Sequence, residues 1–177
     1  MANYVYIATS LDGYIATEDG GIDWLHEIPN PDGSDFGFAE FMDSIDALIM
    51  GRNTFEVVQS FGQWPYNKMV FVLSNTLADI PKELSGKAEV VRGDLKEIIN
   101  QLNERGYNDF YIDGGKVIQS FLEEQRIHEL IITRIPILLG NGIPLFGKQN
   151  HQTKLEHIKT EVYNNALVKS HYKILHS

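Results

Sequence analysis

Three short segments combine glycine, small polar residues and cations directly after apolar runs, at residues 51–54, 74–76 and 113–116. Glycine at the end of a buried strand lets a ligand approach the backbone closely. A guanidinium such as that of Arg52 matches the geometry of phosphate, and the first N–H groups of a helix attract anions. The chemistry that these residue types favour is therefore the binding of a polyphosphate.

Each segment alone also has an ordinary structural explanation. Residues 51–54 are compatible with a turn, a surface ion pair and a helix N-cap, and 74–76 with a simple turn. Residues 113–116 fit a tight strand–helix turn, and no Gly-x-Gly-x-x-Gly dinucleotide fingerprint is present. Arg52 and Lys116, however, bring two cations to one region of a chain with net charge −9, which favours the phosphate interpretation.

The elements that must position these segments alternate between strand and helix patterns. Apolar or β-branched runs predict strands over the ranges 4–8, 47–50, 69–73, 110–112 and 130–133. Helical spacing predicts helices over about 35–44 and 53–59. A third helix, capped by Asp94 and ended near Gly106, and a fourth follow from the apolar stripes Leu95, Ile98, Ile99, Leu102 and Val117, Ile118, Phe121, Leu122. Two alternating runs, 155–163 and 167–174, predict a C-terminal antiparallel hairpin around Asn164-Asn165.

This order predicts an α/β fold with a mostly parallel central sheet, helices on both faces and an antiparallel edge. Ligands of such sheets bind beyond the carboxyl ends of the strands, which is where all three segments fall. The loop over residues 20–33 contains Gly, Pro and Asp together with Trp24, Leu25 and Ile28. Apolar anchors in a long loop are typical of a segment that covers a site.

Composition narrows the class of protein. The chain has 177 residues, 43% of them hydrophobic and 22% charged, which predicts one globular domain over residues 1–177. It has no cysteine, which excludes disulfide scaffolds and thiolate chemistry, and its six histidines show no metal-ligand spacing. The acidic balance makes nucleic acid and membranes poor partners, and the first residues do not resemble a signal peptide, so we expect a cytoplasmic protein without a metal.

Four blocks give the chain a recognisable pattern: residues 10–16 (Ser-Leu-Asp-Gly-Tyr-Ile-Ala), 50–54 (Met-Gly-Arg-Asn-Thr), 113–115 (Asp-Gly-Gly) and 135–146, which begins Ile-Pro-Ile-Leu-Leu-Gly-Asn-Gly. In this order they resemble the dihydrofolate reductase-like superfamily. The first and last blocks narrow the resemblance to the reductase domain at the C-terminus of bifunctional riboflavin-biosynthesis (RibD) proteins, in its single-domain bacterial form. The resemblance extends from Tyr4 to Tyr172.

The resemblance implies a three-layer α/β/α fold with about eight strands in its sheet, NADPH as hydride donor, and a homodimer. It also implies which residues contact the cofactor. Ala8 and Ile15 would border the nicotinamide. Phosphate contacts would come from Gly51, Arg52, Asn53 and Thr54. The adenosine end would meet Leu73, Ser74 and Asn75. The pyrophosphate would meet Gly114, Gly115, Lys116 and Val117.

Several residues depart from the pattern of true dihydrofolate reductases. Asp23-Trp24 replaces a Pro-Trp element in the covering loop, and Asp113-Gly114 aligns with a Gly-Gly pair, which places an acid near a phosphate site. Asn75 stands where an arginine often binds the 2′-phosphate of NADPH. A preference for NADPH over NADH would then depend on Arg52, with Arg92 as a second candidate.

The candidate catalytic residues lie on the substrate side. A carboxylate in an apolar pocket can have a raised pKa and protonate the acceptor nitrogen. In dihydrofolate reductases, which the chain resembles, such a carboxylate binds the pterin ring. Ungapped alignment with that family places Asp35 in this role, whereas matching the aromatic residues of the helix places Glu40 there. Asp35 can also be a plain N-cap. Asp12 is either a contact to the polar edge of the substrate or a turn residue. Trp24 either closes over the substrate or anchors its own loop.

The resulting hypothesis is an NADPH-dependent reductase that transfers hydride to a C=N bond, or its open-chain sugar equivalent, in a pyrimidine or pterin-like substrate. The type reaction is that of 5-amino-6-(5-phosphoribosylamino)uracil reductase. The alternatives are a genuine dihydrofolate reductase and a non-catalytic NADPH-binding dimeric module. No basic residues for a substrate phosphate can be assigned from the sequence.

Overall fold

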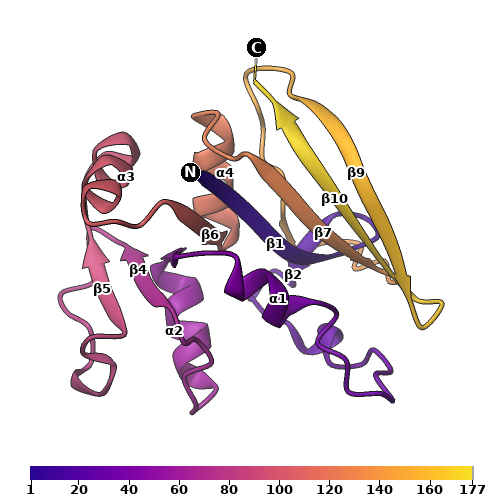
Figure 1. Ribbon diagram of the computed structural model, residues 1–177. Coiled ribbons are helices and arrows are strands. Elements are labelled where there is room, and N and C mark those ends of the chain that lie inside the picture. The colour runs from indigo at the N-terminus through magenta and orange to yellow at the C-terminus, as the bar shows by residue number, and fades with distance from the viewer. Residues whose placement is uncertain (177) are drawn as a thin grey trace.

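The computed structural model describes residues 1–176 and contains an eight-stranded mixed sheet in the order β5-β4-β3-β6-β1-β7-β10-β9 (Figure 1). Its strands are β1 (Ala2–Ser10), β3 (Ala47–Gly51), β4 (Met69–Leu73), β5 (Ala88–Val91), β6 (Asp109–Asp113), β7 (Glu129–Ile135), β9 (Lys154–Tyr163) and β10 (Leu167–Leu175). The helices are α1 (Phe38–Asp43), α2 (Arg52–Ser60), α3 (Leu95–Glu104) and α4 (Gly115–Glu123), with short 3₁₀ turns η1 (Asp23–Leu25) and η2 (Lys82–Leu84).

Alternating side chains of the central strands pack against two helical layers. On β3, Ala47 and Ile49 pack in one core with residues of α3 and α4, whereas Leu48 and Met50 pack in a second core with residues of α1 and α2. All four are fully buried, as a strand covered on both faces requires. Figure 1 shows the two helix pairs on opposite sides of the sheet. The predicted three-layer α/β/α fold is therefore confirmed.

The C-terminal hairpin is also confirmed. β10 pairs antiparallel with both β7 and β9, so that β9 forms the outer edge of the sheet. Asn164 and Asn165 connect the hairpin strands with φ values of 54° and 53°. Two consecutive left-handed residues are what a two-residue hairpin turn needs, and asparagine tolerates this conformation better than most residues.

The sequence prediction missed three strands and misplaced one helix start. β5 has four residues, and β2 (Tyr14–Ala16) and β8 (Ile143–Pro144) form a small separate antiparallel pair, so none of them carries a clear periodic signal. The helix expected from residue 35 begins at Phe38, because Gly37 adopts φ 88° and breaks the helical backbone. The predicted ends of α3 are confirmed: Asp94 accepts a hydrogen bond from Lys96 N (2.9 Å), and Gly106 follows the helix with φ 94°.

No helix within residues 1–176 is both long enough and apolar enough to cross a lipid bilayer.

Candidate functional site

Sheet topology places the three predicted segments side by side. β4, β3 and β6 are adjacent and mutually parallel, so their carboxyl ends lie at one edge of the sheet. Leu73 pairs with Gly51, and Met50 pairs with Asp113, at the last positions before the chain leaves each strand. We call these segments the strand-exit site: residues 51–54, 73–76 and 113–117.

Direct packing joins the first segment to the third. A Cβ atom added to Gly114 would collide with the Thr54 hydroxyl, and one added to Gly51 would lie 3.1 Å from Val117 Cγ2. Gly114 also has φ 94°, a conformation that favours glycine. Gly114 therefore meets both a steric and a backbone demand for glycine, whereas Gly51 leaves room for a close side-chain contact with Val117.

Arg52 joins the first segment to the second. Its Nη1 donates to Thr76 Oγ1 (3.1 Å), and its Nε donates to Glu56 Oε1 (2.7 Å) on the next helical turn. Both partners of the ion pair are nearly half exposed, so the pair is screened and adds little to stability. The guanidinium therefore stands at the junction of two strand exits and can change partners at small cost.

Ser74 serves its own turn. It is buried, and its hydroxyl accepts hydrogen bonds from Thr76 N (3.2 Å) and Leu77 N (3.0 Å), as in the simpler of the two interpretations of this segment. Leu73 is half-buried beside it, and Asn75 is exposed. Arg92, at the end of the neighbouring β5, donates to the carbonyl oxygens of Leu77 and Ala78 and braces the same turn.

Two helices begin at the strand-exit site without a side-chain cap. Among the described residues, none supplies a capping hydrogen bond at Gly51 for α2 or at Gly114 for α4, in contrast to Asp94 at α3. The first N–H groups of a helix have no intrahelical partner, and the helix dipole adds partial positive charge there. Asn53 and Lys116 are exposed in the first turns of these two helices. The arrangement suits a diphosphate that bridges both helix starts.

The small β2–β8 sheet covers the start of α4. A Cβ added to Gly115 would lie 2.8 Å from Ile15 Cδ1 and 3.6 Å from Ile143 Cγ2. Ile15 therefore lies against the strand-exit site, next to Gly114 and Gly115.

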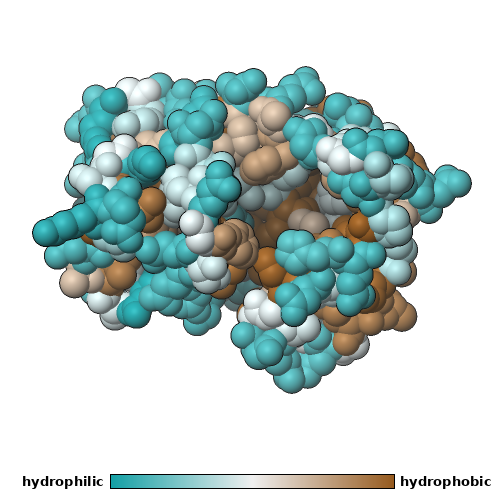
Figure 2. Space-filling model, turned by 90° about the horizontal axis from the view of Figure 1, so that it is seen from below, coloured by the Kyte–Doolittle hydropathy of each residue, from teal (hydrophilic) through white to brown (hydrophobic). Residues whose placement is uncertain are grey.

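A covering loop lies over the ends of β1 and β7. We call residues 17–37 the lid loop. Its Trp24 is buried and packs with Ile135 and Leu167, and the half-buried Ala8 lies against the same group. Trp24 thus anchors its own loop. Figure 2, viewed from below Figure 1, shows a hollow with hydrophobic side chains at its base between hydrophilic rims on this face of the molecule.

Asp12 connects two loops. Its Oδ1 accepts from the Ser10 hydroxyl (2.6 Å) and from Leu139 N (3.1 Å), and its Oδ2 accepts from Gly140 N (2.8 Å). These hydrogen bonds, that from Ser10 first, lower the pKa of Asp12. All of them stabilise the ionised carboxylate, and they tie the Ser-Leu-Asp-Gly block to the Leu-Leu-Gly-Asn-Gly block. The hydrogen bonds from Leu139 N and Gly140 N come from a distant loop, so Asp12 does more than form a local turn.

The two alternative catalytic carboxylates, Asp35 and Glu40, are both exposed. Asp35 precedes the helix and caps it: Oδ2 accepts from Ala39 N (2.9 Å) and Oδ1 from Gly37 N (2.9 Å). These amides lower the pKa of Asp35, so the raised pKa expected of an acid in an apolar pocket is not found there. Glu40 lies in the first turn of α1, on the solvent side. The structure does not bring either carboxylate into the strand-exit site.

Asp113 is the carboxylate that the sequence did not identify as a candidate acid. It ends β6, shares the α1–α2 face with Tyr111, and accepts a hydrogen bond from Gly114 N (2.8 Å). Burial raises the pKa of Asp113 to about 6, against the opposing effect of that amide. The sequence does contain one signal for this role, because Asp113 directly follows the apolar strand residues 110–112. Its Asp-Gly sequence, however, resembles an ordinary turn.

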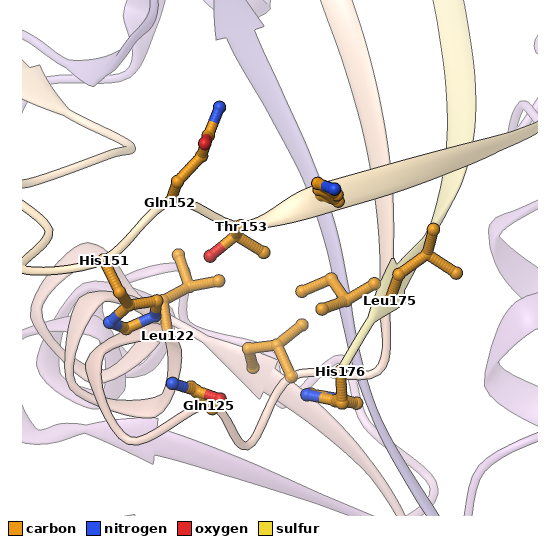
Figure 3. Close-up of a pocket in the computed structure, with 10 residues that line it drawn as sticks. Leu122, Gln125, His151, Gln152, Thr153, Leu175 and His176 are labelled. Atoms are coloured by element: carbon orange, nitrogen blue, oxygen red, sulfur yellow. The ribbon is translucent and has the colours of Figure 1, made fainter.

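A separate cavity of about 320 Å³ lies between the end of α4, the start of β9 and the end of β10 (Figure 3). Leu122, Gln125, His151 and His176 are among its lining residues, and none of the predicted site residues is. It is thus distinct from the strand-exit site.

Burial of Asp113 predicts a measurable pH dependence of stability. Its pKa is higher in the folded protein than in the unfolded chain, so folding takes up a proton between pH 4 and 6. The stabilising contribution is complete below about pH 4 and is lost as the pH rises through about 6. Asp113→Asn should therefore raise the free energy of unfolding by about 1–3 kcal/mol at pH 8 and by much less at pH 4. Urea denaturation at both values measures this, and an equal effect at both would contradict it.

Close packing at Gly114 predicts an effect larger than backbone strain alone. Gly106 has the same φ, 94°, with nothing within 4 Å of an added Cβ, so it provides a matched control. Gly106→Ala should cost about 1 kcal/mol, whereas Gly114→Ala should cost at least ~2 kcal/mol because the Thr54 side chain must move. Equal losses in urea denaturation would show that the two exits do not pack as described.

Comparison with known proteins agrees with this geometry. The sequence profile of the RibD C-terminal domain matches residues 4–169. The Bacillus subtilis (strain 168) protein YwjB, itself described as uncharacterized, is 36% identical over 174 residues, covering 95% of both chains. The crystal structure of a putative riboflavin biosynthesis protein from Shewanella sp. PV-4 superposes with a TM-score of 0.96 at 50% identity, over 99% of this chain and 100% of that one.

A dihydrofolate reductase from Enterococcus faecalis, solved in complex with NADP(H) and the compound RAB-propyl, shares the fold alone. It has a TM-score of 0.68 at 16% identity, over 98% of this chain and 96% of the reductase chain. The dihydrofolate reductase-like architecture is thereby confirmed. With the profile match over most of its length, the chain belongs to the RibD C-terminal domain family.

Proposed function

We propose that this protein is an NADPH-dependent reductase that transfers hydride to a C=N bond, or its open-chain sugar equivalent, in a pyrimidine or pterin-like substrate. The reaction would be of the 5-amino-6-(5-phosphoribosylamino)uracil reductase type. The observation that carries the proposal is the pair of uncapped helix starts, α2 and α4, brought together at Gly51 and Gly114.

The residues at the strand-exit site fit the proposed cofactor. A dinucleotide needs room for its pyrophosphate against backbone N–H groups, and Gly114 and Gly115 leave α4 without side chains at its start. Arg52 and Lys116 add exposed positive charge on either side, in a protein of net charge −9. When bound, NADPH would supply the hydride, and the protein would hold donor and acceptor in contact and keep water away.

The relatives support the same reading. The Shewanella protein that is 50% identical is described as a putative riboflavin biosynthesis protein, and the E. faecalis reductase is described as a complex with NADP(H). These descriptions belong to those proteins. They support a reductase in the present case because the chain matches the RibD C-terminal domain over residues 4–169.

The acceptor nitrogen gains a proton during reduction, and a nearby acid or an ordered water on the lid-loop side would supply it. Trp24 and Ala8 would close this side of the site against water. Asp35 and Glu40 stay predictions, with the capping role of Asp35 explaining its position without catalysis.

Cofactor binding tests the proposal directly. NADPH at about 100 times its dissociation constant should add ~2.7 kcal/mol to the free energy of unfolding, a rise in Tm of roughly 5–11 °C, and NADH should add less. Arg52→Gln should reduce the NADPH shift and the discrimination against NADH. Arg105→Gln is the matched control, since Arg105 forms a similarly exposed ion pair with Glu89 (2.8 Å) away from the strand exits.

The outcomes separate the functions. No shift with millimolar NADPH or NADH would overturn the reductase proposal. A shift without turnover of any C=N acceptor would instead favour a non-catalytic module, and turnover of dihydrofolate would favour a genuine dihydrofolate reductase.

We also propose that the protein acts as a homodimer through the β9–β10 hairpin. β9 is a ten-residue edge strand, exposed along most of its length, with Leu155, Ile158 and Val162 exposed by 44%, 48% and 60%. A long edge strand with exposed apolar side chains is a template for pairing with another strand, and a second copy supplies an identical one.

Oligomeric state tests this second proposal. Light scattering coupled to size-exclusion chromatography should give twice the mass of the chain, and Val162→Lys should shift the protein toward monomer without unfolding it. A monomer at high micromolar concentration would contradict the proposal.

A further inference from the structure

One peptide carbonyl in the lid loop accepts hydrogen bonds from three separate strands. Phe36 O receives Lys169 Nζ at 2.7 Å, Tyr6 Oη at 3.1 Å and Tyr163 Oη at 3.4 Å. The donors lie on β10, β1 and β9. We call these four residues the Phe36 clamp. A carbonyl oxygen has two lone pairs, so three donors exceed its usual number of hydrogen bonds. All three donors are distant in sequence, so they are not part of a local turn.

The backbone at this carbonyl adopts a conformation that its residue types disfavour. Phe36 has φ 55° and Gly37 has φ 88°, so two successive residues are left-handed. The first of them is a bulky aromatic, for which this conformation is uncommon and costly. Space at Gly37 is also limited, because an added Cβ would lie 3.1 Å from Lys169 Nζ. The clamp therefore contacts a turn in which two successive residues adopt the left-handed conformation.

A lysine at position 169 carries a free-energy cost, because its charged side chain is buried. Its side chain is 9% exposed, and burial of an ammonium is unfavourable without partners. Glu161 Oε2 lies 3.2 Å from Nζ, and the rings of Tyr163 and Tyr6 lie 5.2 Å and 6.0 Å away. Burial alone would lower the pKa of Lys169, but Tyr163, Tyr6 and Glu161 outweigh it and raise the pKa, so the ammonium stays charged. An aliphatic residue would pack in this row without such compensation.

Sheet register places the clamp next to the expected nicotinamide position. Ala8 pairs with Thr133, Thr133 pairs with Lys169, and Lys169 pairs with Glu161. These four residues form one row across four strands, all on the face that α1 and the lid loop cover. Neighbouring strands are ~4.8 Å apart, so Lys169 lies about two strand spacings from Ala8. The Phe36 side chain packs with Ala8 and Trp24 in the same apolar group.

We propose that Lys169 is a positioning residue, which holds the Phe36 carbonyl so that the lid loop and the start of α1 close over the nicotinamide half of the cofactor and the substrate beside it. The proposal rests on the reductase function proposed above. Lys169 does not contact the reacting atoms in this role. It acts through Phe36, and through the Asp35 cap that follows from the same turn.

The test compares two ligands that share the strand-exit site. NADPH reaches both the strand-exit site and the lid, whereas adenosine 2′,5′-bisphosphate lacks the nicotinamide half and reaches only the former. Lys169→Met keeps the apolar stem and removes the ammonium, and Lys159 remains 3.3 Å from Glu161. We expect the Kd for NADPH to rise roughly tenfold and the Kd for the bisphosphate to stay unchanged. Lys169→Arg retains a donor and should restore most of the NADPH affinity.

Lys173→Met is the matched control, because Lys173 lies on the same strand and the same face but is exposed. It removes the same charge and should change neither Kd. Hydrogen exchange gives a second readout that needs no ligand. In Lys169→Met the amides of residues 37–41, which form the first turn of α1, should exchange at least tenfold faster, while those of β3 and β6 keep their rates.

Each outcome decides one proposal. If wild-type protein binds neither ligand, the reductase function fails, and hydrogen exchange still shows whether Lys169 orders the lid. If Lys169→Met weakens both ligands equally, or leaves NADPH binding and the exchange of residues 37–41 unchanged, Lys169 is a packing residue and the positioning proposal is overturned.

Discussion

Parallel hydrogen bonding of β3 to both β4 and β6 is the constraint on which the rest of the site depends. A parallel pair cannot be joined by a tight turn, so each strand is followed by a crossover that returns the chain to the opposite edge. The turns that leave these strands then meet at one place. Two of the crossovers start with a helix immediately, at Arg52 and Gly115, and this is why two helix starts lie side by side.

The strand-exit site carries charges of both signs, although the net charge of the chain is −9. Arg52 and Lys116 are exposed cations, while Asp113 places an acid among them, half-buried and with a raised pKa. A carboxyl that is partly protonated repels a phosphate less than an ionised one. The same burial that costs stability above pH 6 therefore lessens the repulsion that Asp113 would exert on an anion at the strand-exit site.

Much of this could be predicted from the sequence, because the central strands are buried on both faces. Continuous apolar runs such as 47–50 and 69–73 identify those strands, and the residues that follow them mark the site. Short strands such as β5 and the two-residue β8 contain too few residues to show the alternation of apolar and polar residues that identifies a strand. The helical spacing of the residues after Asp35 predicts a helix that starts there, whereas the helix begins three residues later, at Phe38, after the left-handed Gly37.

Lys169 shows a different limit. It lies in a strand of alternating polar residues, where lysine ordinarily faces solvent, and the sequence holds no sign that Phe36 comes to cover it. Burial of this side chain arises from contacts 133 residues apart along the chain, which no local pattern encodes. Asp113 had a visible position at a strand end, but its environment depends on Tyr66 and Tyr111, which come from separate segments.

The Phe36 clamp also has a consequence for how the molecule is made. Lys169 and Tyr163 are synthesised after the strands that carry the strand-exit site, yet they contact the lid loop, which is synthesised much earlier. All residues of the strand-exit site precede the β9–β10 hairpin in the chain, whereas two donors of the clamp lie in that hairpin. In a nascent chain the Phe36 clamp can therefore form only after the β9–β10 hairpin has been synthesised, later than the residues of the strand-exit site.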